Sequence, residues 1–142
     1  MKYLLDTNVY LDASRSAIRR DQFKTTFFPL LPATYLSAVV AYELMVNAAD
    51  RHSRAYVEDF IPPLERTGRI VTPTHDDWME AAALVTAIEV RDKAWRSKLP
   101  ALLNDILIAL SARRVGAMVL TRNRRDFLLI RRYKGFSLRI VE

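Results

Sequence analysis

Residues 3–8 read Tyr3-Leu4-Leu5-Asp6-Thr7-Asn8, an apolar run that ends at a carboxylate. The run fits a short buried strand, and Asp6 then lies just past the carboxyl end of that strand. In parallel sheets, ligands bind beyond this edge. Asp6 is therefore a candidate site residue, although an aspartate at this position can also serve only as the N-cap of a following helix.

Two further carboxylates lie inside apolar stretches. If residues 36–46 are helical, Glu43 faces inward with Val39 and Val40, and Asp105 is placed in the same way beside Ile108. An ionised carboxylate in an apolar setting is costly and tends to protonate unless a cation is present. The alternative is that either acid pairs with a buried arginine, but the pattern places no inward-facing arginine near them. The acids together predict a shared acidic pocket that binds a metal.

The order of the remaining segments predicts the fold class. Short apolar strands alternate with helices, which is typical of an α/β sandwich with a mainly parallel sheet. We expect strands at 2–5, 35–37, 69–71, 117–120 and 138–141. We expect helices at 14–24, around Glu43, at 51–66 with a kink or break at Pro62-Pro63, after an N-cap at Thr74, up to about 115, and at 124–131. In the helix after Thr74, the expected apolar face contains Trp78, Ala81, Ala82, Val85 and Ile88.

Composition narrows the class of protein. The 142 residues are 51% hydrophobic and 27% charged, which fits one globular domain covering residues 1–142. There is no cysteine, so disulfides, thiolate nucleophiles and cysteine-based zinc sites are excluded. The first apolar run is too short for a signal peptide, and no stretch is long enough for a membrane span. We therefore expect a cytoplasmic protein that does not enter a membrane.

Charge is unevenly distributed along the chain. The net charge is +6, but residues 113–142 hold nine basic and two acidic residues, a net +7, which leaves residues 1–112 at −1. A basic region beside an acidic pocket suits a nuclease, because binding a polyanion and binding a metal require opposite charges close together. Arginines that only keep a small domain soluble are the alternative interpretation.

Four blocks of sequence, taken in order, resemble the PIN-domain ribonucleases and more closely the VapC-type toxins of prokaryotic toxin–antitoxin pairs. The acids of these blocks are spaced by 37, 62 and 21 residues. The blocks are residues 5–9 (LDTNV), 37–44 (SAVVAYEL), 104–109 (NDILIA) and 120–127 (LTRNRRDF). The resemblance implies a three-layer α/β/α sandwich with a short, mainly parallel central sheet. It extends over nearly the whole chain, although residues 14–34 and 50–100 match only in pattern.

The resemblance also implies a set of site residues. Asp6, Glu43 and Asp105 correspond to the core acids, and the fourth position falls at either Asn123 or Asp126, because relatives carry an acid at one place or the other. We expect Asp126 to be the charged member and Asn123 a neutral helper. The alternative for Asp126 is an ordinary surface ion pair with a neighbouring arginine.

Two hydroxyl and amide side chains complete the expected site. Thr121 either holds Asp6 or a metal-bound water, or only shapes a turn with Asn123, and Asn8 is expected to support the acids. All-oxygen ligands without cysteine or paired histidines favour Mg²⁺ or Mn²⁺. We expect metal-assisted hydrolysis of an RNA phosphodiester. Without the metal the acids repel, so at least one should have a raised pKa.

Candidate RNA contacts are basic or aromatic. The segment 91–98 interleaves cations with a tryptophan, which suits phosphates and a stacked base, or is a solvated loop whose tryptophan packs into the core. The candidates are Arg15, Arg19, Arg20, Lys93, Trp95, Arg96, Arg122, Arg124 and Arg125.

Function follows from the resemblance rather than from spacing. It implies an endoribonuclease toxin that cleaves a structured RNA such as tRNA and arrests translation, a cognate antitoxin and a homodimer. The alternative is a catalytically inactive RNA- or partner-binding module that uses the basic C-terminal region. A phosphotransferase with an aspartyl nucleophile would need a second aspartate where Asn8 stands, and no glycine-rich phosphate loop is present.

Overall fold

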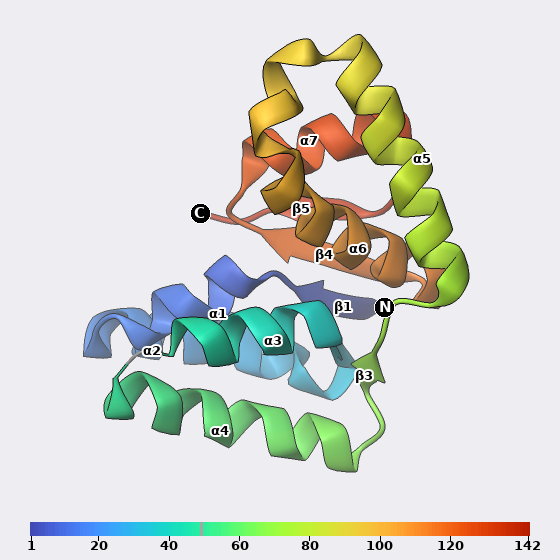
Figure 1. Ribbon diagram of the computed structural model, residues 1–142. Coiled ribbons are helices and arrows are strands. Elements are labelled where there is room, and N and C mark those ends of the chain that lie inside the picture. Colours follow the sequence, from blue (N-terminus) through green and yellow to red (C-terminus); the bar gives the residue numbers. More distant parts are fainter. Residues whose placement is uncertain (49) are drawn as a thin grey trace.

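A computed structural model describes residues 1–48 and 50–142. Five short parallel strands form one sheet in the order β3-β2-β1-β4-β5. The strands are β1 (Lys2–Leu5), β2 (Thr34–Ser37), β3 (Ile70–Val71), β4 (Ala117–Thr121) and β5 (Leu138–Ile140). In Figure 1 the helices α5 to α7 lie on one side of the strands and α1 to α4 on the other. The predicted α/β/α sandwich with a parallel sheet is confirmed.

Helices connect the strands. They are α1 (Thr7–Ser14), α2 (Ala17–Phe27), α3 (Ala38–Asn47), α4 (Arg51–Arg66), α5 (His75–Arg91), α6 (Leu99–Val115) and α7 (Arg124–Tyr133), with 3-10 helices η1 (Phe28–Ala33) and η2 (Lys93–Lys98). Local signals set several ends. Thr74 and Asp77 form a capping box at the start of α5, and Gly116 ends α6 at a φ of 72°, a conformation that favours glycine.

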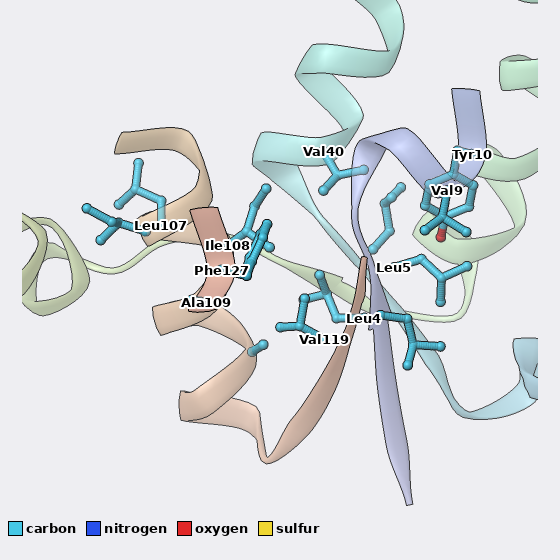
Figure 2. Packing of buried hydrophobic residues seen from close by; sticks show 14 of the residues in the cluster. Leu4, Leu5, Val9, Tyr10, Val40, Leu107, Ile108, Ala109, Val119 and Phe127 are labelled. Atoms are coloured by element: carbon cyan, nitrogen blue, oxygen red, sulfur yellow. The ribbon is translucent and has the colours of Figure 1, made fainter. Parts of the chain in front are cut away.

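The core lies on both faces of the central strands. Leu4, Leu36 and Val119 are fully buried, as expected for strands covered by helices on each side. Figure 2 shows side chains from β1, β4, α1, α3, α6 and α7 meeting in one cluster. This packing fixes the carboxyl ends of β1, β2 and β4 at one edge of the sheet.

The helices differ from the predicted ones in several places. The helix expected at 14–24 is α2 at Ala17–Phe27, because the Ser16 side chain accepts a hydrogen bond from the Arg19 amide at 3.1 Å and starts the helix there. Helix α1 was not predicted. Helix α4 contains Pro62 and Pro63 without a break, since its buried Val57 and Leu64 hold it against the core. The 3-10 helix η2 had no counterpart among the predicted elements.

The buried face of α5 also differs from the predicted one. Asp77, Ala81, Leu84 and Ile88 are buried, while Trp78 is 47% exposed. Ala82, also expected inside, is exposed. The buried stripe is rotated because Asp77 turns inward to cap the helix and to receive Arg114 at 3.1 Å.

Candidate active site

Asp6 and Thr121 meet because β1 and β4 are neighbours in register. Leu5 pairs with Leu120, and the Asp6 amide donates to the Leu120 carbonyl at 2.9 Å. Just past this pair, the Thr121 hydroxyl donates to Asp6 Oδ2 at 2.7 Å, and Thr121 is fully buried. Thr121 therefore holds Asp6, which is one of the roles considered for it. Asp6 is also the N-cap of α1, because its Oδ1 accepts the Thr7 amide at 2.8 Å.

Glu43 reaches the same edge of the sheet from α3, which begins where β2 ends. The Thr7 hydroxyl donates to Glu43 Oε1 at 2.7 Å, and Asn104 Nδ2 donates to Oε2 at 3.4 Å. Thr7 and Asn104 were not predicted as site residues. The only signal for them was that each directly adjoins a predicted acid, Asp6 and Asp105.

Asp105 from α6 and Asp126 from α7 complete the acidic cluster. Asn123 Nδ2 donates to Asp126 Oδ2 at 3.0 Å and lies 3.5 Å from Asp105 Oδ2. The Asp126 amide in turn donates to Asn123 Oδ1 at 3.3 Å, so Asn123 caps α7. Both residues considered for the fourth position therefore line the site, with the amide of Asn123 between two carboxylates.

Asn8 and the loop after β4 hold the cluster in place. Asn8 Nδ2 donates to Asp6 Oδ2 at 3.1 Å, and its Oδ1 accepts the Arg122 amide at 3.1 Å. The Asn123 amide donates to the Thr121 hydroxyl at 2.9 Å. These contacts orient Asp6 from two directions, as a preorganised site requires.

The acids perturb one another as the sequence predicted. Burial raises the pKa of Asp105 to about 9, with further increases from Asp6, Asp126 and Glu43. Burial also raises the pKa of Asp6 to about 6, although hydrogen bonds from Thr121 and Thr7 lower it. The expectation that at least one acid has a raised pKa is confirmed, and Asp105 is protonated at neutral pH in the absence of a cation.

The cluster lacks a protein cation. Within the described residues none of the four carboxylates forms a salt bridge. The alternative in which Glu43 or Asp105 pairs with a buried arginine is therefore not observed among these residues. The surface ion pair considered for Asp126 is not observed there either. Nor do any three acidic or histidine side chains in the part of the chain that the structure describes form a group that could hold a metal ion. Mg²⁺ needs only one or two protein carboxylates and otherwise keeps its waters. The uncompensated, all-oxygen donor set fits such an ion.

On one flank of the cluster, three predicted RNA contacts converge on Asp12 of α1, which was not predicted as a site residue. Arg19 forms a hydrogen bond with Asp12, Arg122 Nε lies 3.3 Å from its Oδ2, and Arg15 lies 3.9 Å away. Asp12 is one helical turn from Asn8. Helix α1 therefore contacts Arg122 twice, because Asn8 accepts the backbone amide of Arg122 and Asp12 pairs with the side chain of Arg122. Arg20 lies on α2 and is half-buried.

On another flank, η2 places Trp95 against α7. The guanidinium carbon of Arg125 lies 4.7 Å from the centroid of the Trp95 ring. Trp95 is half-buried and packs on the core while one face meets this arginine. Arg96 Nε lies 3.7 Å from Glu89, and Lys93 and Arg124 are exposed. The structure therefore brings Trp95 and Arg125 together. Arg15, Arg19 and Arg122 lie elsewhere, around Asp12 of α1.

Comparison with known proteins assigns the chain to a family. Residues 3–133 match the PIN domain model, and the chain belongs to this family. PIN domains are generally nucleases. No curated protein matches the sequence significantly.

Solved structures show the same fold at low sequence identity. VapBC2 from Rickettsia felis, bound to a DNA fragment from its promoter, has 19% identity and a TM-score of 0.67, with 100% of both chains covered. DNA-bound VapBC from Salmonella typhimurium has 21% identity and a TM-score of 0.65 over 99% of this chain and 98% of that one. FitAcB from Neisseria gonorrhoeae has 21% identity and a TM-score of 0.60 over 96% and 95%.

Proposed function

We propose that the protein is a Mg²⁺- or Mn²⁺-dependent endoribonuclease that acts as the toxin of a toxin–antitoxin pair. The observation that carries the proposal is the meeting of Asp6, Glu43, Asp105 and Asp126 without a protein cation in the described residues. A fold that gathers four acids at the carboxyl edge of its sheet bears the cost of their repulsion, which a bound divalent cation would relieve.

The acids divide into two proposed roles. Asp6 and Asp105 would hold the metal, since Asp6 is oriented by Thr121 and Asn8, and Asp105 is the acid whose charge most needs compensation. Glu43 and Asp126 could also bind the ion. A bound Mg²⁺ would polarise the scissile phosphate and lower the pKa of a water.

The chain itself would position the reacting groups. Glu43 is partly exposed and oriented by Thr7, so either of its carboxylate oxygens could accept a proton from an attacking water. Asp126 is the other candidate for this role. Asn123 would help to orient both the Asp105 and Asp126 carboxylates, because its amide nitrogen contacts an oxygen of each. The arginines on both flanks would bind phosphates of the RNA strand.

The partners are proposed from the resembling structures. Three of them are VapBC or FitAB complexes, which supports a cognate antitoxin for this chain. Exposed apolar side chains of Tyr42, Met45 and Val46 on α3 offer a surface that an antitoxin or a second copy in a homodimer would cover. In this proposal one domain, residues 1–142, cleaves a structured RNA such as tRNA in the cytoplasm and arrests translation. No helix in residues 1–48 and 50–142 is long and apolar enough to span a membrane.

The test is cleavage of total cellular RNA by the purified, antitoxin-free protein in Mg²⁺. Asp6→Asn and Asp105→Asn should each abolish cleavage, and so should EDTA. Asp59→Asn, which removes an exposed acid on α4, is the matched control and should cleave normally. Mapping the ends of the fragments would identify the RNA.

Two results would contradict the proposal. Cleavage that persists in Asp105→Asn or in EDTA would remove the acidic cluster from the chemistry. RNA that binds but stays intact in Mg²⁺ and in Mn²⁺ would favour the catalytically inactive binding module instead.

A further inference from the structure

Trp95 and the arginines of α7 form a single surface feature, although about thirty residues separate them in the sequence. Arg125 stacks on the Trp95 ring with its guanidinium carbon 4.7 Å from the ring centroid, and Lys98 Nζ lies 5.6 Å from the same centroid. One face of this indole therefore accepts a flat cationic group. A base of a nucleic acid is another flat group that stacks on tryptophan.

A hollow of about 690 Å³ opens beside this stack, which we call the Trp95 pocket. Its apolar side consists of Trp95, Leu128 and Leu129. Four arginines supply the rest of its lining, and no acidic side chain is among the described residues that line it. The lining arginines are Arg124, Arg125, Arg131 and Arg132. An apolar wall beside concentrated positive charge fits a group that is aromatic at one end and anionic at the other.

The Trp95 pocket is next to the acidic cluster along the chain of α7. Arg124 and Arg125 directly precede Asp126 in the first turn of the helix, whose N-cap Asn123 contacts two of the acids. Arg131 and Arg132 lie near the other end of α7, roughly 9 Å further along the helix axis. The pocket and the acidic cluster therefore draw on neighbouring residues of the same helical turn.

We propose that the Trp95 pocket binds an unpaired base of the RNA next to the cleaved bond. The base stacks on Trp95 in place of the Arg125 guanidinium, and the arginines of α7 bind the adjoining phosphates. This inference rests on the proposed ribonuclease function and adds to it a site for one base, which must be unpaired because a base inside a continuous duplex cannot stack on a protein ring.

Fluorescence of Trp95 itself tests the stacking. The chain has two tryptophans, so Trp78→Phe, at an exposed position on α5, leaves Trp95 as the only one. Adding Asp6→Asn prevents cleavage during titration. A short single-stranded RNA should quench Trp95 in this double variant, whereas inorganic polyphosphate should bind without comparable quenching because it has no bases. Equal quenching by both polyanions would overturn the proposal.

Affinity measurements in the Asp6→Asn background give a second test. Trp95→Ala should weaken single-stranded RNA binding roughly ten-fold or more. Arg131→Gln removes one charge from the pocket and should weaken binding several-fold more than Arg66→Gln, which removes one exposed charge at the end of α4. A duplex of the same sequence should bind less tightly than the single strand.

The controls separate this inference from the parent proposal. Thermal unfolding shows whether Trp95→Ala stays folded, and if it does not, the quenching experiment, which retains Trp95, decides. Unchanged affinity for single-stranded RNA in a folded Trp95→Ala protein would overturn the proposal that the pocket binds a base. Equal losses of affinity in Arg131→Gln and Arg66→Gln would overturn it as well. Quenching by RNA in the double variant, together with no RNA cleavage by the wild type, would instead support the pocket and refute the nuclease.

Discussion

Replacing Asp105 by asparagine should stabilise the metal-free protein. The pKa of this acid is raised from 3.8 to about 9 in the fold. At pH 7 the unfolded chain has Asp105 ionised while the folded chain keeps it protonated. Keeping the carboxyl protonated at pH 7, about three pH units above its ordinary pKa of 3.8, costs the folded state about 4 kcal/mol. Asparagine has no charge to neutralise, so Asp105→Asn should gain about 2–4 kcal/mol of unfolding free energy at pH 7, less than the full cost because an amide is also buried there.

The sign of the pH dependence follows from the same pKa. Between the unfolded value of 3.8 and the folded value of about 9, the folded protein binds more protons at this residue than the unfolded chain does. Stability of the wild type should therefore fall as pH rises through this range. The advantage of Asp105→Asn should grow by up to about 1.4 kcal/mol per pH unit and level off above pH 9.

Urea unfolding in EDTA at several pH values between 5 and 9 measures this advantage. Asp59→Asn, at an exposed position, controls for the loss of one negative charge and should show no such trend. Adding Mg²⁺ should stabilise the wild type more than Asp105→Asn, because the variant lacks one of the carboxylates that would bind the ion. An Asp105→Asn protein that is no more stable than the wild type at pH 8, or whose advantage does not change with pH, would refute the reasoning.

Three further substitutions test the contacts that shape the site and its supporting helices. Thr121→Val should lower the free energy of unfolding by about 1–3 kcal/mol, because Asp6 and the Asn123 amide lose a buried partner. Thr121→Ser keeps the hydroxyl and should lower it less, and urea unfolding compares the two variants. Thr121→Val should also raise the pKa of Asp6 further, which NMR titration of the carboxyl would detect, and an unchanged pKa would contradict the assigned hydrogen bond. Gly116→Ala should lower stability by about 1 kcal/mol because its φ is 72°, whereas Gly135→Ala, which meets open space without a positive φ, should not; equal melting temperatures would argue against the left-handed cap. Asp77→Ala should lower the free energy of unfolding by about 1–2 kcal/mol through the lost capping box and the lost Arg114 contact. The same change at its exposed neighbour, Asp76→Ala, should lower it by only about a few tenths of a kcal/mol. Similar losses for the two variants in chemical denaturation would show that the cap contributes little.

The candidate acids were predictable because each violates a local rule. Asp6 ends an apolar strand, and Glu43 and Asp105 interrupt apolar helical faces, so the sequence itself marks them as exceptions. The caps at Thr74 and Gly116 were predictable for the same reason, since a helix end depends on the hydrogen bonds and backbone angles of a few adjacent residues. The roles of Thr7 and Asn104 were missed, because a hydroxyl or amide beside an acid is common and becomes informative only when its partner across the fold is known.

The sequence by itself predicted the strands, most of the helices and the candidate acids Asp6, Glu43 and Asp105, because short-range hydrophobic patterning and helix capping act between residues that are close along the chain. Tertiary structure alone decided which face of α5 is buried, that Asp12 gathers Arg19 and Arg122, and that Trp95 lies against Arg125. It also decided the raised pKa of Asp105, which depends first on the burial of its carboxyl and then on the charges of acids from three other segments. These properties arise from packing between distant segments, and packing energies depend on positions in space that no local pattern encodes.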